Sequence, residues 1–272
     1  MIDFFSALFS YGFIIRAFIA GTLISLCASL LGIVLVLKRF SMIGDGLSHV
    51  GFGTMAVAMA FNWAPLAVSV PVCILAAFLL LRVSASSSGV KGDAAIALIS
   101  SSALAIGIIV TSVTSGLNTD VTAFMFGSIL AISRTDVIIS VILGAVVINL
   151  FVLLYNRIFL VTFDESFATA SGIRSSAYNA LVAVLTALTV VVGMRLMGAM
   201  MISSLIVFPA LSAMRVFKSF LKVVVCAAVL SIVCFTAGMT VSFAWSTPAG
   251  ASIVAANLAA FLICFAAGKT RR

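Results

Sequence analysis

The sequence predicts an all-α, polytopic bundle of transmembrane helices, and composition and patterning both support this prediction. Hydrophobic residues make up 64% of the 272 residues and charged residues only 8%, whereas a soluble domain carries about a quarter charged residues. The mean hydropathy is +1.37. The apolar residues also fall into runs long enough to cross a bilayer, which takes about 20 residues of helix. We therefore expect one transmembrane domain over residues 1–272, with no room for a sizeable soluble domain.

The apolar runs define the expected helices in order. They lie at about 11–37, 44–61, 63–83, 93–115, 135–156, 177–195, 198–214, 222–245 and 248–268. A shorter apolar piece at about 121–132 is predicted to be a re-entrant or tilted half-helix. Because the runs at 44–61 and 198–214 are short, the number of crossing helices is predicted as eight or nine.

Basic residues predict the orientation of this bundle. If nine helices cross with the N-terminus outside, only Arg16, Arg134 and Arg195 fall on the outer side, and the other lysines and arginines fall on the inner side. Positive residues favour the cytoplasmic face, so we expect the N-terminus outside and the C-terminus in the cytoplasm. The net charge of +8 belongs to these loops, so it is not a signal for nucleic-acid binding. The five dispersed cysteines include no C-x-x-C pair and are expected to be packing residues.

Asp45 and His49 are the candidate metal ligands. His49 is the only histidine of the chain, and residues four apart on a helix project from the same face. A carboxylate and a neutral imidazole so placed can share one divalent transition ion, and ionisable groups within a membrane are usually functional. The alternative is an Asp near the headgroups at a helix start and a His hydrogen-bonded in the core of the bundle.

The segment 163–174 differs from the other inner loops because it is amphipathic. Asp164 can cap a short helix, with Glu165 in its first turn and Gly172 at its end. Phe167 and Ala168 give this helix an apolar side. We expect a helix at about 164–172, parallel to the membrane, that docks a partner; the alternative is a surface helix with no partner.

Glycine and proline mark other helices of the bundle. Gly44, Gly46, Gly51 and Gly53 fall in one span, where small residues let helix backbones approach closely. Pro209 removes a backbone donor in the middle of its span, so a kink is predicted there. Pro71 predicts the same in the third span.

Six sequence blocks follow one another along the chain. They are KRFSMIGDGLSH at 38–49, GDAAIA at 92–97, NTDV with FGSILA between 118 and 131, FDESFATASG at 163–172, Gly198 through Pro209-Ala210 to Arg215, and TPAGASIV at 247–254. In this order they resemble the membrane permease family of ATP-binding-cassette importers for zinc, manganese and ferrous iron. The sequence departs from the family pattern at 210–213 and at Gly51-Phe52-Gly53.

The resemblance implies a function and a set of site residues. Asp45 and His49 would line the translocation path and contact the ion, and the 164–172 segment would be the coupling helix that seats in a groove of the ATPase. The residues implied in coupling are Asp164, Glu165, Phe167, Ala168 and Gly172, and those implied in helix kinks and packing are Gly198, Pro209, Pro248 and Gly250.

The resemblance also implies partners and a location. The permease would act as a homodimer in the bacterial cytoplasmic membrane, with the path at its two-fold interface, and would work by alternating access. A cytoplasmic ATPase dimer would drive it, and an extracytoplasmic metal-binding lipoprotein or periplasmic protein would deliver the ion. No cofactor would be bound permanently, since the divalent metal is the cargo; zinc is expected first, then manganese or ferrous iron.

The sequence gives little support to an enzymatic function. Gly268-Lys269-Thr270 copies the end of a P-loop, but Ile263 stands in place of its first glycine. The lone His has no nucleophile elbow beside it. The chain is therefore expected to have no ATPase of its own. A secondary, proton-coupled metal transporter is the alternative, although such proteins usually carry more buried acidic residues; whether Asp93 or Asp120 also lines the path stays open.

Overall fold

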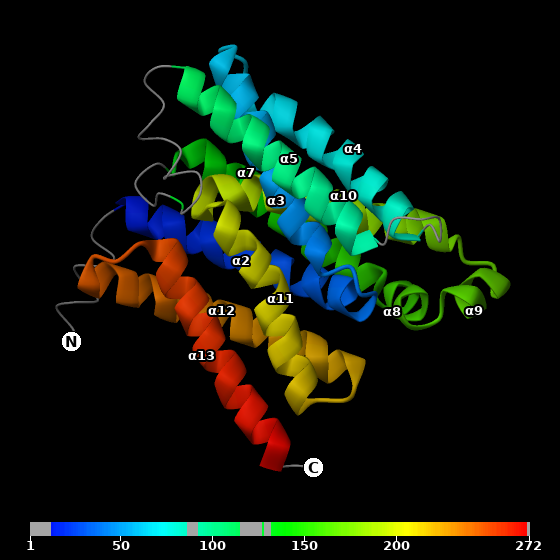
Figure 1. The fold of residues 1–272 in the computed structure, drawn as a ribbon. Coiled ribbons are helices and arrows are strands. Elements are labelled where there is room, and N and C mark those ends of the chain that lie inside the picture. Colours follow the sequence, from blue (N-terminus) through cyan, green and yellow to red (C-terminus); the bar gives the residue numbers. More distant parts are fainter. Residues whose placement is uncertain (1–11, 86–91, 115–126, 128–131, 271–272) are drawn as a thin grey trace.

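The computed structural model describes residues 12–85, 92–114, 127 and 132–270, and every regular element within them is an α-helix. In chain order these are α2 (Gly12–Leu37), α3 (Met42–Ala60), α4 (Pro65–Ala85), α5 (Gly92–Val113), α7 (Arg134–Leu153), α8 (Tyr155–Phe163), α9 (Glu165–Ala170), α10 (Ser175–Met197), α11 (Ala199–Val216), α12 (Phe220–Trp245) and α13 (Ala249–Thr270). Figure 1 shows the long helices gathered into one bundle, with α8 and α9 at one end of it.

The helices reproduce the expected hydrophobic runs, with a difference in how many qualify as membrane spans. Among the described residues, seven helices are long and apolar enough to cross a membrane: α2, α4, α5, α7, α10, α12 and α13. The prediction of eight or nine also counted α3 and α11. The segment 121–132, expected as a half-helix, lies almost wholly outside the described residues.

The two remaining helices differ from these seven in length and composition. Helix α11 has 18 residues, at the short end of what a membrane span needs. In α3, glycines and polar residues dilute the apolar content, and most of its side chains are buried by other helices. A helix inside the bundle is shielded from lipid by its neighbours, so it does not need a continuous apolar surface.

The core of the bundle forms around α2 and α10, which are the most buried of the seven spans. Close packing there depends on glycine. A Cβ on Gly32 of α2 would collide with the backbone carbonyl of Ile206 in α11, and one on Gly53 of α3 would lie 2.5 Å from the carbonyl oxygen of Ala103 in α5. The contact at Gly53 confirms the prediction of close backbone approach for that glycine, whereas Gly44, Gly46 and Gly51 lie against side chains of neighbouring helices.

Helix α8 was not predicted. The chain leaves α7 at Leu154 and starts a second, amphipathic helix, which joins the bundle through aromatic rings. The ring centroids of Tyr155, Phe159 and Phe163 lie 5.4, 5.2 and 5.8 Å from that of Phe220 at the start of α12. Aromatic pairs at these separations are stabilising, so α8 is a fixed platform for α9.

The residues singled out for kinks and packing lie at helix junctions or within helices. Gly198 separates α10 from α11 with φ +94° and ψ 152°, a conformation essentially reserved for glycine. The carbonyl of Pro248 accepts a hydrogen bond from the amide of Ser252 at 3.1 Å at the start of α13, and Gly250 is buried in the first turn. Pro209 lies inside α11, which continues to Val216; its kink stays a prediction.

Candidate functional site

The turn between α2 and α3 brings Asp45 and His49 to one end of the bundle. Arg39 adopts a left-handed conformation with φ +61°, and the amide of Phe40 donates to the carbonyl of Leu35 at 2.7 Å. This hydrogen bond closes the end of α2 and lets α3 begin at Met42. Asp45 then lies in the first turn of α3, where the helix dipole favours a negative charge.

The Asp45 and His49 side chains face each other across one helical turn. His49 Nε2 lies 3.6 Å from Asp45 Oδ2, too far for a good hydrogen bond. Two ligands in a tetrahedral zinc site, each about 2.1 Å from the ion, lie about 3.4 Å apart. The observed separation therefore fits two donor atoms that share one small divalent ion.

Burial differs between the two side chains. The Asp45 side chain is 40% exposed and the His49 side chain 15% exposed. His49 Nδ1 is fully buried and has no hydrogen-bond partner among the described residues. This does not agree with the alternative of a histidine fully satisfied in the core, because an unsatisfied buried polar atom costs free energy.

The described part of the chain supplies two donors and no complete ligand set. No group of three or more His, Cys, Asp or Glu residues comes together within it. The Ser48 hydroxyl donates to the backbone carbonyl of Asp45 at 2.7 Å. Asp120 lies outside the described residues, as does the side chain of Asp93. A closed metal cage needs further ligands from elsewhere.

The expected short helix is present as α9. Asp164 Oδ1 accepts a hydrogen bond from the amide of Phe167 at 2.8 Å, which is the predicted N-cap. Gly172 follows the helix with φ +81°, a left-handed conformation that favours glycine. Phe167 is 57% exposed, whereas Ala168 is 0% exposed. Of the two side chains predicted to form the apolar side of this helix, only Phe167 is therefore exposed, and Ala168 packs against its own chain.

A polar junction attaches α9 to the bundle. Lys38 Nζ lies 3.2 Å from Glu165 Oε2, and Asn179 Nδ2 donates to Glu165 Oε1 at 2.9 Å. Lys38 also donates to the side-chain oxygen of Asn179. These three residues, which we call the Lys38 junction, link the end of α2, the start of α9 and the second turn of α10. Glu165, which the resemblance implies in coupling, is engaged within the chain.

The sequence did not predict that these three side chains meet. Lys38 stood out only as one of the basic residues of an inner loop, and Glu165 only as a charge in a first helical turn. Asn179, a carboxamide in an otherwise apolar span, was the one visible hint, but its partners lie far away in the sequence.

Comparison with known proteins assigns nearly the whole chain to one family. The family model described as "ABC 3 transport family" matches residues 10–268. The chain belongs to this family. The match covers all the described membrane helices. It confirms the resemblance found in the sequence.

Individual relatives carry more specific names. The high-affinity zinc uptake system membrane protein ZnuB of Buchnera aphidicola is 30% identical over 89% of this chain and 92% of its own length. The manganese import system permease protein ScaB of Streptococcus gordonii is 27% identical over 97% of this chain and 94% of its own length. In the solved structure of PsaBC from Streptococcus pneumoniae in complex with Fab, the matching chain is 28% identical, with a TM-score of 0.87 over 97% of this chain and 95% of that chain.

Proposed function

We propose that this chain is the membrane permease subunit of an ATP-driven importer for a divalent transition metal, with zinc or manganese as the cargo. The family and the printed names of its relatives support the transport of a metal. The observation that carries the proposal within this structure is the Asp45–His49 pair, whose donor atoms lie 3.6 Å apart on a helix enclosed by the bundle.

A pair of this kind suits transport better than storage. One carboxylate and one imidazole hold a divalent ion less tightly than a closed set of four ligands, and an ion that must leave requires moderate affinity. A second copy of the chain would add another Asp45 and His49. We therefore propose that two copies face each other across a two-fold axis, with the ion path between them.

The energy for transport would come through α9 from a separate ATPase. Phe167 is exposed on α9, Asp164 caps the start of this helix, and the Lys38 junction attaches it to the bundle. A rigidly attached helix with one exposed aromatic side chain is suited to filling a groove in a partner, because such anchors contribute much of the binding free energy. The secondary-transporter alternative has no comparable support, since neither the family nor the relatives favour it.

The two ligands narrow the choice of metal but do not fix it. Imidazole and carboxylate together accept zinc and also manganese, and the relatives include proteins named for each. Zinc is our first candidate because the spacing of the two donor atoms is close to that of a tetrahedral pair.

The test is uptake by vesicles that contain the purified chain together with its ATPase and its metal-binding protein. Radiolabelled zinc and manganese are supplied outside and ATP inside. We expect uptake that requires ATP and that continues after a protonophore is added. Uptake without ATP that collapses with the proton gradient would instead establish a secondary transporter.

A further inference from the structure

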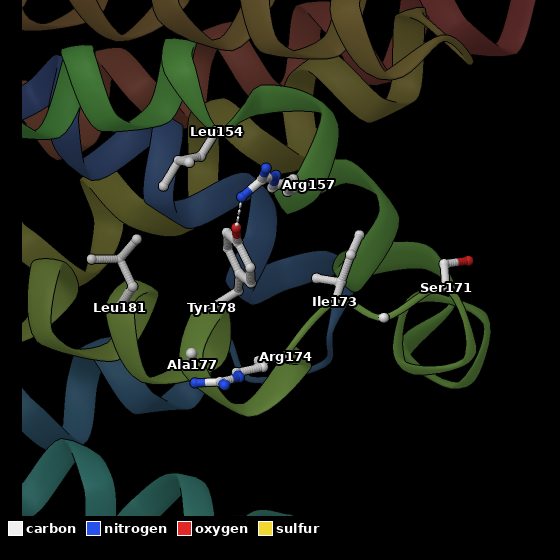
Figure 2. A pocket seen from close by; sticks show the side chains of 9 residues that line it. Leu154, Arg157, Ser171, Ile173, Arg174, Ala177, Tyr178 and Leu181 are labelled. Atoms are coloured by element: carbon white, nitrogen blue, oxygen red, sulfur yellow. Dashed lines mark hydrogen bonds between the residues drawn. The ribbon is translucent and has the colours of Figure 1, made fainter.

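A large pocket lies beside α9, away from the Asp45–His49 pair. Its volume is about 700 Å³, and it is bounded by α8, by the link from α9 to α10 and by the first turns of α10. Figure 2 shows Arg157 and Arg174 on either side of the Tyr178 ring, with Leu154 and Leu181 near by. A volume of this size is typical of sites for small molecules.

The pocket carries positive charge that the described residues do not neutralise. Its lining includes Arg157 and Arg174 but no carboxylate. Arg157 Nη1 donates to Tyr178 Oη at 2.8 Å, and this hydrogen bond raises the pKa of Arg157, so the guanidinium stays charged. The acidic groups of the neighbouring α9 segment are already engaged, Asp164 by the cap and Glu165 by the Lys38 junction.

The surroundings of the pocket distinguish among possible anions. The residues immediately before it, Val152 and Leu153 at the end of α7, are 67% and 77% exposed, as expected for side chains that face lipid. Leu154 and Leu181 continue this apolar surface into the pocket. The pocket thus joins two guanidinium groups to an apolar surface that continues from the end of α7. Basic pockets beside transmembrane helices suit phospholipid headgroups.

We propose that this pocket binds the headgroup of an anionic phospholipid. The phosphate diester accepts hydrogen bonds from the guanidinium groups of Arg157 and Arg174, whose planar forks match phosphate oxygens. The acyl chains lie along the exposed end of α7. The ligand shares its phosphate chemistry with soluble phosphates, but those have no apolar part to cover Leu154 and Leu181.

The experiment measures binding of fluorescent phosphatidylglycerol to the full chain purified in detergent, alone and together with its ATPase partner. Unlabelled phosphatidylglycerol should displace the probe, whereas phosphatidylcholine and inorganic phosphate should not. The double variant Arg157→Gln/Arg174→Gln should weaken binding by about tenfold or more, because both charge-assisted contacts are lost. Lys222→Gln is the matched control, since it removes an exposed basic residue at the start of α12, outside the pocket.

Single variants and competing ligands separate the contributions of charge and of lipid. Arg174→Gln alone, at an exposed position, should fold and still reduce affinity, and Tyr178→Phe keeps both charges and should reduce it less. Equal binding by the double variant and the Lys222→Gln control would overturn the proposal. Displacement by inorganic phosphate would assign the pocket to a soluble anion, and loss of the probe when the ATPase binds would assign it to the protein interface; either result also refutes the lipid.

Discussion

The Asp45–His49 pair makes the most specific prediction at the scale of single residues. Asp45→Asn replaces the charged carboxylate by a neutral amide oxygen, which is a weaker ligand, and His49→Ala removes the imidazole donor altogether. Loss of even a supporting residue around a metal commonly costs tenfold or more in affinity or activity, so we expect ion uptake to fall by about tenfold or more in each variant. The measurement is radiolabelled-ion uptake in reconstituted vesicles at matched protein amounts.

Thr54→Ala serves as the control for these variants. Thr54 lies further along the same helix, and its hydroxyl bonds to the backbone of α3 and to Ser69. It should keep most of its uptake. If Asp45→Asn and His49→Ala both transport at the level of this control, the pair is not part of the path.

The Lys38 junction allows a charge-reversal test. Lys38→Glu places two carboxylates together and should weaken the attachment of α9, while the double variant Lys38→Glu/Glu165→Lys restores an opposite-charge pair. The Glu165 side chain is 53% exposed but the Lys38 side chain is only 11% exposed, so Lys38→Glu should also lower stability, and the double variant should recover part of this loss. The expected change is in coupling, measured as ions transported per ATP hydrolysed: low in Lys38→Glu and recovered in the double variant. Equal coupling in all three proteins would show that the junction transmits nothing.

At this scale the sequence predicts side chains that are neighbours along a helix and misses those that meet through the fold. The four-residue spacing predicted that Asp45 and His49 share a face, and the structure confirms it. The spacing could not show that His49 Nδ1 lacks a hydrogen-bond partner among the described residues, because this depends on every helix around the side chain. Nor could it join Lys38 to Glu165 and Asn179, which meet only after three helices pack.

At the scale of elements, α9 is the part of the chain whose role is most directly testable. Phe167→Asp would place an unpaired charge in a buried contact with the ATPase, which commonly costs 2–5 kcal/mol. We expect the ATPase to be lost on co-purification, along with ion-stimulated hydrolysis. Metal binding by the isolated chain should persist, because Asp45 and His49 lie on another helix.

Phe167→Leu is the matched control, since it keeps an apolar anchor of smaller size. It should retain the ATPase. Full transport and normal co-purification of Phe167→Asp would show that α9 is a surface helix without a docking role.

Helices α8 and α9 differ in how well local sequence patterns predict them. Asp164 and Gly172 are local signals for a start and a stop, and both mark α9 correctly. Helix α8 was missed because the predicted run 135–156 continues through Tyr155 and Asn156, so the sequence shows no break at Leu154, just before α8 begins. Ala168 and Phe167 were placed together on one apolar side, yet only Phe167 is exposed, because a helix of six residues has too little periodicity to separate the two directions.

At the scale of the whole molecule, the prediction concerns orientation. Ser219 and Thr247 are exposed and bracket α12 at its two ends. With the basic residues inside, a cysteine at Ser219 should be labelled by a membrane-impermeant thiol reagent only from the cytoplasmic side, and one at Thr247 only from outside. The label is applied to intact cells and to inverted vesicles of a variant lacking the five native cysteines.

The opposite labelling pattern would invert the proposed topology, and labelling of both positions from one side would mean that α12 does not cross the membrane. The fold class and the positions of the long helices followed from composition and apolar runs alone. The number of spans did not, since glycines and polar residues dilute the apolar content of α3, most of whose residues are buried inside the bundle.

The contact between Gly53 and the Ala103 carbonyl limits how the Asp45–His49 pair can move. Two helices that touch backbone to backbone cannot turn about their own axes independently, because either turn would drive a side chain into the other main chain. Helix α3 is held in this way by α5, and Gly107 of α5 in turn lies against Phe52 of α3. A conformational change that opens the pair to one side of the membrane must therefore move α3 and α5 together as one rigid unit. Relative motion is then expected between this unit and the other helices of the bundle.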